Sequence, residues 1–305
     1  MPQILLRGFT IAPDREQVWV SDKRTGKTFQ TAVRKIASER GYYDLGGSAI
    51  LDAVMNRADD AALGIINRIR ERRSLGGVGK FDRGLLATIV AIQMLRTRGY
   101  QEGRRHLAQT LFDKIYEKTG TVDPEFREYL AEDRLRDEYL RAIPESTQRF
   151  LPHLLDKDLL LFRTDCSVPF YVSDNPVALN NTTNPGDGIR GTLALAVHGI
   201  EVYFPISSEL TLGFLCPSIA KQYETNSNLL WQMGGFIKES AYEYLQARDT
   251  GKPLILSRDK VRFQNSPQAH NAERFVVSSV NEFADVADII ENDPDARFGP
   301  RATTN

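Results

Sequence analysis

Gln93 and Arg96 are polar residues at positions where a predicted helix should be apolar. From about residue 82 to 98, apolar side chains recur every three or four residues, and Gln93 and Arg96 continue two of these stripes. A buried guanidinium without a partner is costly, so Arg96 needs a carboxylate or an anionic ligand beside it. Such a group could hold a phosphate or a reacting oxygen. The structural alternative is an internal polar network that joins two helices.

Asp52 and Asp59 are the candidate partners of Arg96 in the preceding predicted helix, and Asp174 is another candidate. The first two lie in a helix predicted over residues 48–73, about two turns apart on one side. We predict that one of them lies within salt-bridge distance of Arg96. In a catalytic interpretation they are additional carboxylates beside the guanidinium.

Asp174 follows the predicted strand PFYVS and precedes Asn175, which a following proline holds extended. A carboxylate at the end of a strand often contacts a ligand, so we assign Asp174 the role of general base or Mg²⁺ ligand. Asn175, Asn265 and Arg274 are assigned to ligand binding. The structural alternatives are an Asx turn at Asp174, and a contact of Asn265, Gln268 and Arg274 that pins the last helix to the last strand.

Gln93 and Arg96 belong to the helical half of the chain and Asp174 to the β half, so nothing local obliges them to meet. If they line one pocket, the site suits hydrolysis or phosphate binding. Our leading hypothesis is a hydrolase acting on a phosphate-containing ligand, nucleic acid or nucleotide, with Mg²⁺ at Asp174 and Asp59. The alternative is a non-catalytic interaction or regulatory protein that binds a partner encoded in the same toxin or defence operon.

The elements that must position these residues predict an α+β fold. VWVSD and TFQTAV, joined by a turn with Gly26, predict an N-terminal β-hairpin. Helices are expected over 48–73, 82–98, 101–118 and 124–141, then over 218–248 and 260–271. Strands are expected at LLLFRT, PFYVSD, TLALAV, GIEVYFPI, ELTLGFLC, LILS and RFVVSS, in a mostly antiparallel sheet with flanking helices.

No internal repeat or low-complexity linker divides the chain. We therefore expect one α+β domain over residues 1–290, with a helical subregion over about 34–150 and a β-rich subregion over about 155–290. Residues 291–305 are expected to form a mobile tail.

The composition is that of a folded protein, with 41% hydrophobic and 26% charged residues in 305. A formal net charge of −1 gives no global attraction to nucleic acid or to a membrane. We find no signal peptide and no apolar run long enough to span a membrane. Cys166 and Cys216 lack a CxxC spacing, and we expect both to be buried in a cytoplasmic protein.

No sequence motif identifies a cofactor. The glycines of GGVGK (residues 76–80) fail the spacing of a phosphate-binding loop, and Phe81 replaces the required hydroxyl. Nicotinamide, flavin, haem and zinc motifs are absent from the sequence, and the four histidines are isolated. Between Arg57 and Arg105 there are eleven basic and five acidic residues, which could serve a polyanion or form a solvated face.

Several segments together resemble the bacterial family known as domain of unknown function 4238. The family usually has a histidine just ahead of the first segment, where this chain has Met1, and glutamates on the first long helix, where this chain has Asp52 and Asp59. If that histidine belongs to an active site, the chain as given starts after it or lacks that function. The resemblance implies a shared fold and no reaction. The matching segments are PQILLRGF, VWVSDKRTGK, KIASERGYY, LLATIVAIQMLRT, FYVSDNPV, EVYFPISSELTL and NSPQAHNAERFVVSS.

Overall fold

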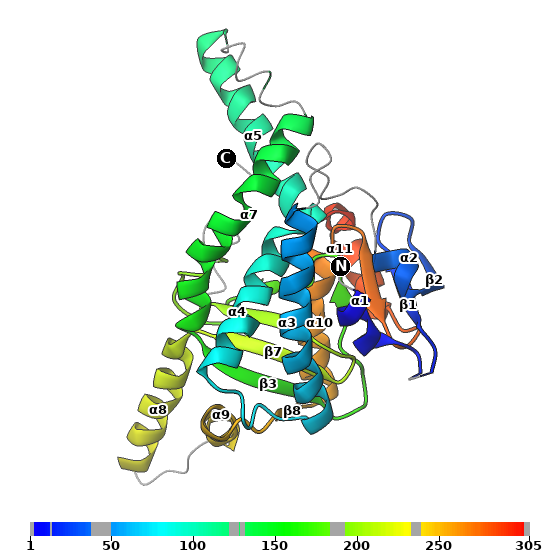
Figure 1. The fold of residues 1–305 in the computed structure, drawn as a ribbon. Helices are drawn as coiled ribbons and strands as arrows, with labels where there is room; N and C mark the ends of the chain where they lie inside the picture. Colours follow the sequence, from blue (N-terminus) through cyan, green and yellow to red (C-terminus); the bar gives the residue numbers. More distant parts are fainter. Residues whose placement is uncertain are drawn as a thin grey trace.

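The helices and two sheets of the protein confirm the predicted α+β class (Figure 1). None of the described helices has a stretch long and apolar enough to cross a membrane. The computed structural model describes residues 3–12, 14–37, 50–121, 128, 132–183, 193–232 and 239–301.

A five-stranded sheet forms the centre of the body, in the order β5-β6-β7-β3-β8. Its pairs are antiparallel except β3 with β8, which is parallel. A parallel pair needs a long connection, and here the chain between β3 and β8 contains the rest of this sheet and two helices. The strands are β3 Asp158–Thr164, β5 Ala178–Asn180, β6 Glu201–Pro205, β7 Leu210–Leu215 and β8 Leu254–Leu256.

A second, four-stranded sheet has the order β2-β1-β9-β4. The predicted hairpin is confirmed as β1 with β2, and β1 also pairs with β9 from the other end of the chain. The hairpin is therefore not an isolated N-terminal unit, because it shares a sheet with the last strand. The strands are β1 Gln17–Asp22, β2 Lys27–Ala32, β4 Val172–Ser173 and β9 Phe275–Ser278.

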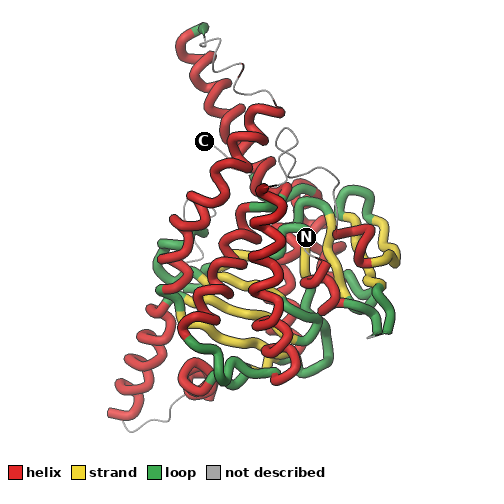
Figure 2. Tube along the Cα trace, viewed as in Figure 1, coloured by secondary structure: helices red, strands yellow, loops and turns green. Residues whose placement is uncertain are grey.

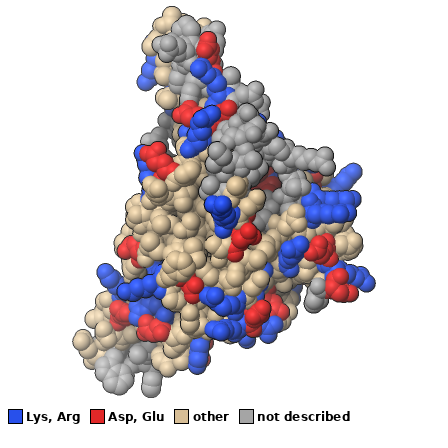
Figure 3. Space-filling model, viewed as in Figure 1, with Lys and Arg blue, Asp and Glu red and all other residues tan. Residues whose placement is uncertain are grey.

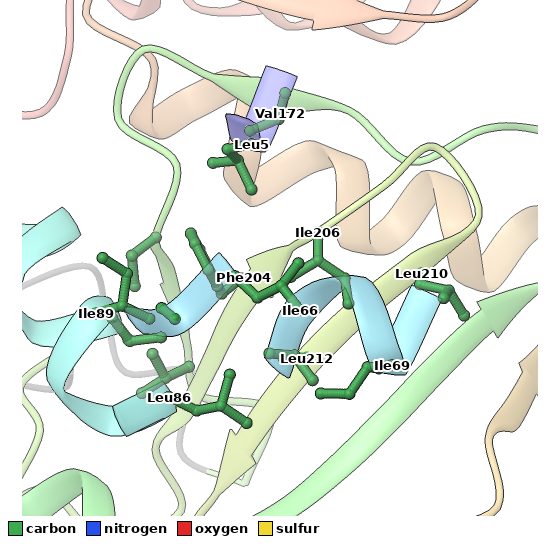
Figure 4. Close-up of a cluster of buried hydrophobic side chains, with 14 of the residues drawn as sticks. Leu5, Ile66, Ile69, Leu86, Ile89, Val172, Phe204, Ile206, Leu210 and Leu212 are labelled. Atoms are coloured by element: carbon green, nitrogen blue, oxygen red, sulfur yellow. The ribbon is translucent and has the colours of Figure 1, made fainter. Parts of the chain in front are cut away.

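Helices cover both faces of the five-stranded sheet (Figures 1 and 2). On one face, α3 and α4 bury an apolar cluster against β6 and β7, and Leu5 of the N-terminal segment joins it beside Val172 (Figure 4). On the other face, α8, α9 and α10 pack over a second cluster. The bounds are α3 Ile50–Arg72, α4 Lys80–Leu95, α8 Pro217–Gln232, α9 Glu239–Thr250 and α10 Arg258–Asn271.

The helix α5 and the first half of α7 project from the body as an arm (Figure 1). α7 continues well past the predicted end at residue 141 and contains Pro144 and Pro152. The remaining bounds are α1 Gln3–Leu6, η1 Arg7–Phe9, α2 Val33–Ala37, α5 Arg98–Thr119, α7 Glu132–Leu155, α11 Ala284–Asn292 and η2 Pro294–Arg297.

Three local expectations differ from the structure. Residues 193–197 of the predicted strand TLALAV form turns, closed by a hydrogen bond from the amide of Val197 to the carbonyl of Ala194. Cys166 is exposed, whereas Cys216 is buried as expected. Within the segment expected to be a mobile tail, η2 is ordered and Arg301 pairs with Glu273 of the body. Residues 302–305 lie outside the described part of the chain.

Gly213 of β7 makes room for an aromatic side chain on the face under α8–α10. It stands beside Tyr203 of β6 and Leu160 of β3. A Cβ atom on Gly213 would overlap Cε2 of Phe162. The Phe162 ring lies over this gap and meets the Tyr203 ring edge to face, with centroids 5.7 Å apart. The missing side chain is therefore part of the packing.

Replacing Gly213 by alanine should destabilise the protein by about 1–3 kcal/mol, because Phe162 must leave its position in a packed core. Gly64→Ala is the matched control, since Gly64 is helical with open space around it and should gain about 0.5–1 kcal/mol. Urea denaturation measures both values. Equal effects of the two substitutions would contradict this account of Gly213.

Candidate functional site

Arg96 forms a bidentate salt bridge with Asp59, which confirms the contact predicted for this pair. Nη1 lies 3.0 Å from Oδ2 of Asp59 and Nη2 lies 2.7 Å from Oδ1. The Arg96 side chain is 6% exposed and that of Asp59 18%. Fork-to-fork pairing satisfies two donors of the guanidinium at once. The pair joins α3 to the end of α4.

Gln93 and Asp52 complete the predicted helical set. Gln93 is 1% exposed, as its place on an apolar stripe predicted. Asp52 lies within α3, but its side chain is outside the described part of the structure. The structure therefore brings Arg96 and Asp59 together and places Gln93 in the interior one helical turn earlier.

The Asp174 carboxylate accepts hydrogen bonds from three consecutive backbone amides. Oδ1 accepts from the amide of Glu273 at 2.8 Å, and Oδ2 accepts from the amides of Arg274 and Phe275 at 2.9 and 3.0 Å. Burial raises the pKa of the Asp174 carboxyl, and the three amides act in the opposite direction. The carboxylate thus anchors the start of β9.

The local turn at this place is made by Ser173, so the predicted Asx turn at Asp174 is wrong. Ser173 Oγ donates to the carbonyl of Asn175 at 2.7 Å and accepts from its amide at 3.3 Å. The Asn175 side chain donates to the carbonyl of Asn271, and the Asn271 side chain donates to the carbonyl of Asn175. Because the Ser173 hydroxyl closes the turn, the Asp174 carboxylate can bind the backbone amides at the start of β9.

Asn265 and Gln268 tie α10 to the segment around β4 rather than to the last strand. Asn265 accepts from the amide of Tyr171 at 2.8 Å and donates to the carbonyl of Pro169 at 2.9 Å. Gln268 accepts from the amide of Ser173 at 3.2 Å and donates to the carbonyl of residue 176 at 2.7 Å. Each amide side chain is used at both ends.

Lys23, at the hairpin turn, caps the last turn of α10. Its Nζ is 2.6 Å from the carbonyl oxygen of Ala269 and 2.7 Å from that of Ala272, and it also reaches His270 at 3.3 Å. Lys23 is only 1% exposed, and burial lowers its pKa to about 8. A cation here satisfies carbonyl groups that the helix end leaves without partners.

Two acidic side chains bind the neighbouring arginines. Asp22 pairs with Arg274 at 2.8 Å. The Glu273 side chain is 2% exposed, and its Oε1 accepts from Arg24 and Arg301, both at 2.8 Å. Its Oε2 also accepts from Arg301, at 2.9 Å. Together these contacts form a polar interlock between the hairpin turn, the β4 turn and the α10–β9 connection. Its members are Asp22, Lys23, Ser173, Asp174, Asn175, Asn265, Gln268, Asn271, Glu273 and Arg274.

The interlock and the Arg96–Asp59 pair are neighbours in space. A Cβ atom on Gly99, in the first turn of α5, would lie 3.1 Å from Nδ2 of Asn175 and 3.7 Å from Cβ of Glu273. The helix that follows Arg96 therefore packs against the turn that contains Asp174. The helical and β halves meet here, where Arg96 binds Asp59 and Asp174 binds the backbone amides of residues 273–275.

Much of the basic region between Arg57 and Arg105 is engaged within the protein. Arg68 pairs with Asp82, Arg73 with Glu209 and Arg105 with Glu102. Two further arginines donate hydrogen bonds to backbone carbonyls. Arg70 donates to Ile4, Leu5 and Ile206. Arg83 donates to Leu155 and Lys157. These contacts favour a structural use of the region over a polyanion surface.

Metal binding at the predicted residues would compete with these contacts. Both oxygens of Asp59 accept from Arg96, and both oxygens of Asp174 accept from backbone amides. Within the described ranges, no group of three or more His, Cys, Asp and Glu side chains could hold a metal ion.

The sequence matches one protein-family model over most of its length. Residues 1–282 match the family described as "Protein of unknown function (DUF4238)". The chain belongs to this family. No curated protein and no solved structure matches the chain. Several of the segments that carried the DUF4238 resemblance, such as VWVSDKRTGK, FYVSDNPV and NSPQAHNAERFVVSS, supply the members of the interlock.

Sequence reasoning missed Asp22, Lys23 and Glu273. Each is a charged residue next to an apolar strand or helix end, and this position alone is typical of exposed loops. The available signal was that all three lie inside DUF4238 segments, and that Glu273 directly precedes the candidate Arg274.

Asp174→Asn should lower the free energy of unfolding by about 1–3 kcal/mol, because an amide offers one acceptor oxygen where both carboxylate oxygens now accept. Asp165→Asn is the matched control at the end of another strand, with an exposed side chain whose hydrogen bond to the amide of Ser167 lies within its own turn. Chemical denaturation measures both. A stability of Asp174→Asn equal to or above that of the parent would point to a strained functional group instead.

The contribution of Glu273 should depend on pH. Burial raises the pKa of its carboxyl, but Arg301 and Arg24 more than offset this and hold it below its usual value of 4.5. A carboxyl group whose pKa is lower in the folded state than in the unfolded state contributes its full stabilisation above the unfolded-state pKa. This stabilisation is lost as the pH falls through the folded-state pKa. The stability difference between the parent and Glu273→Gln should therefore be constant from pH 5 to 7 and shrink below about 4.5. A difference that grows on acidification would refute this.

Proposed function

We propose that the protein is a non-catalytic interaction or regulatory protein that binds a partner protein through the projecting arm. The observation that carries the proposal is an apolar stripe on α5. Leu107, Leu111 and Ile115 follow one another at four-residue spacing and are 49%, 53% and 37% exposed. Residues spaced by four lie on one helix face, and monomeric proteins rarely leave such a face uncovered.

The distal half of α5 contributes little to the body. From Leu111 to Gly120 the side chains are exposed or half-buried, and none is fully buried. Tyr116 adds an aromatic ring that is 51% exposed. An arm that extends from the body and presents apolar side chains is suited to helix-on-helix recognition.

The charges of α5 favour a partner helix with acidic flanks. The helix has five basic residues and three acidic ones, a net of +2, and Glu102 is already bound to Arg105. Antiparallel pairing with a second copy, centred on Leu111, would place Arg104 opposite Lys118. Like charges across a helix pair weaken it, so a second copy is a poorer occupant.

The state of the candidate catalytic residues supports the same proposal. The described carboxylates of the hydrolase hypothesis, Asp59 and Asp174, are both engaged within the chain. Hydrolysis at either would require these bonds to be exchanged for substrate. Their present contacts instead stabilise the body that holds the arm.

Leu111→Glu should abolish partner binding without unfolding the protein, because Leu111 is exposed. Leu229→Glu is the matched control, since Leu229 is 52% exposed on α8. A photo-cross-linking amino acid at position 111 or 229 identifies proteins held in cells, and the purified partner is then titrated against both variants. We expect cross-links from position 111 and at least a tenfold rise in Kd for Leu111→Glu alone, on the order of a hot-spot residue.

Two outcomes would overturn the proposal. The first is an identical set of cross-linked proteins from positions 111 and 229. The second is a dimer of the parent protein in light scattering that Leu111→Glu converts to a monomer, which would assign the stripe to a second copy of the chain.

A further inference from the structure

A buried polar cluster lies on the face of the five-stranded sheet beneath α8–α10, apart from the interlock. Its centre is Glu201 of β6, which is 4% exposed. The carboxylate accepts hydrogen bonds from Asn180 at 3.1 Å, from Tyr203 at 2.9 Å and from the hydroxyl of Thr182. These donors are neutral, and in the part of the chain that the structure describes no Lys, Arg or His forms a salt bridge with Glu201.

The strand register puts a second carboxylate on the same face. Leu215 of β7 pairs with Glu201 on one side and with Asp158 of β3 on the other. Directly opposed residues share a face, and neighbouring strands are about 4.8 Å apart, so the two acidic backbones are about 10 Å apart. One short ligand can therefore reach both carboxylates.

Several polar atoms around these carboxylates have no hydrogen-bond partner. They are Oδ2 of Asp158, the hydroxyl of Tyr244 and Oε1 of Gln264. Tyr244 of α9 is 6% exposed and Gln264 of α10 is 7% exposed. A buried polar atom left unpaired is costly and is rare in folded proteins.

Several of these groups are close enough to interact electrostatically. Burial raises the pKa of the Tyr244 phenol, the nearby negative charges of Asp158 and Glu201 raise it further, and Arg248 lowers it. Burial also raises the pKa of the Asp158 carboxyl, whereas Arg248 and Arg83 lower it. The pKa of Tyr203 is raised by burial and then by Glu201, and Gln264 lies within hydrogen-bonding reach of its hydroxyl. Asp158 is half-buried, which places this end of the cluster nearest to solvent.

Aromatic rings pack beside these groups. Phe162 meets Tyr203 with centroids 5.7 Å apart, and Tyr223 meets Tyr244 with centroids 5.0 Å apart. Aromatic faces attract cations, and the unpaired atoms of Asp158 and Gln264 can only accept hydrogen bonds when the acid is ionised. The chemistry that matches both features is a cation that donates N–H bonds.

We propose that this cluster is a binding site for a small organic ammonium ion, held by Glu201 and Asp158 and enclosed by the tyrosine rings. The ammonium group donates to the carboxylates, to the amide oxygen of Gln264 and to the phenol oxygen of Tyr244, and the alkyl part lies against the aromatic rings. Because the cluster is distant in sequence from α5, the site does not depend on the partner-binding role of the arm.

The test is isothermal titration calorimetry of the full chain with ethylammonium and with the dication of 1,4-diaminobutane. Neutral controls are 1-propanol and 1,4-butanediol, with potassium chloride to hold ionic strength constant. We expect saturable binding of at least one ammonium probe and none of the alcohols. Glu201→Gln should weaken binding by about tenfold or more, because a hydrogen bond to a charged acceptor contributes more than a neutral one.

Tyr244→Phe keeps the test decisive if Glu201→Gln does not fold. The hydroxyl it removes has no partner, so the unliganded variant should be as stable as the parent or more stable. Its ammonium affinity should nevertheless fall several-fold. Glu209→Gln is the control for loss of a carboxylate near the same sheet, because Glu209 lies in the turn before β7, is 40% exposed and pairs with Arg73. It should bind as the parent does.

Three results would overturn the inference. Binding of the alcohols as tightly as the ammonium probes would assign the site to neutral ligands. Failure of both ammonium probes to bind would leave ordered water as the occupant that satisfies the unpaired atoms. Ammonium binding unchanged in both Glu201→Gln and Tyr244→Phe would place it elsewhere.

Discussion

The carboxylate of Asp174 holds the start of β9 through three consecutive backbone amides, and the second sheet depends on this contact. β4 contributes only two residues to that sheet, so its backbone bonds alone give β9 a weak neighbour. Side chains supply the remaining attachment. Asn265 and Gln268 hold the same segment to α10, and Lys23 holds α10 to the hairpin. Each buried charge thereby has partners, which offset part of the cost of its burial, although burial still raises the pKa of Asp174 and lowers that of Lys23.

The two faces of the central sheet are built differently. The face under α3 and α4 is closed by apolar side chains, both aliphatic and aromatic. The opposite face combines apolar packing with Glu201, Tyr203 and Tyr244. Gly213 leaves room for the ring of Phe162, which packs against Tyr203. A fully satisfied polar group in a core specifies one arrangement, whereas an unpaired one marks a place where another molecule can bind. This contrast separates the interlock from the Glu201 cluster.

Local sequence pattern was sufficient for most elements. The hairpin and the helices α3, α4 and α10 follow from residue spacing, because amphipathic periodicity reflects which face is buried. The pattern failed at TLALAV, where a short apolar run forms turns, since such a run does not by itself provide a neighbouring strand. It also could not show that β1 pairs with β9, because strand pairing between chain ends leaves no local signature. The alternation of side chains says which face is buried and not which strand is adjacent.

The sequence by itself determined that Arg96 must be buried beside a carboxylate or an anionic ligand, because a guanidinium on an apolar helix face has to be neutralised, and the structure supplies Asp59. It also singled out Asp174 and Asn265, as residues for catalysis or ligand binding or for local structural contacts. Only the tertiary structure decided their partners. The partners of Asp174 are backbone amides about a hundred residues away. Backbone amides are present at every position except proline, so no residue type in the sequence marks which of them a carboxylate will meet.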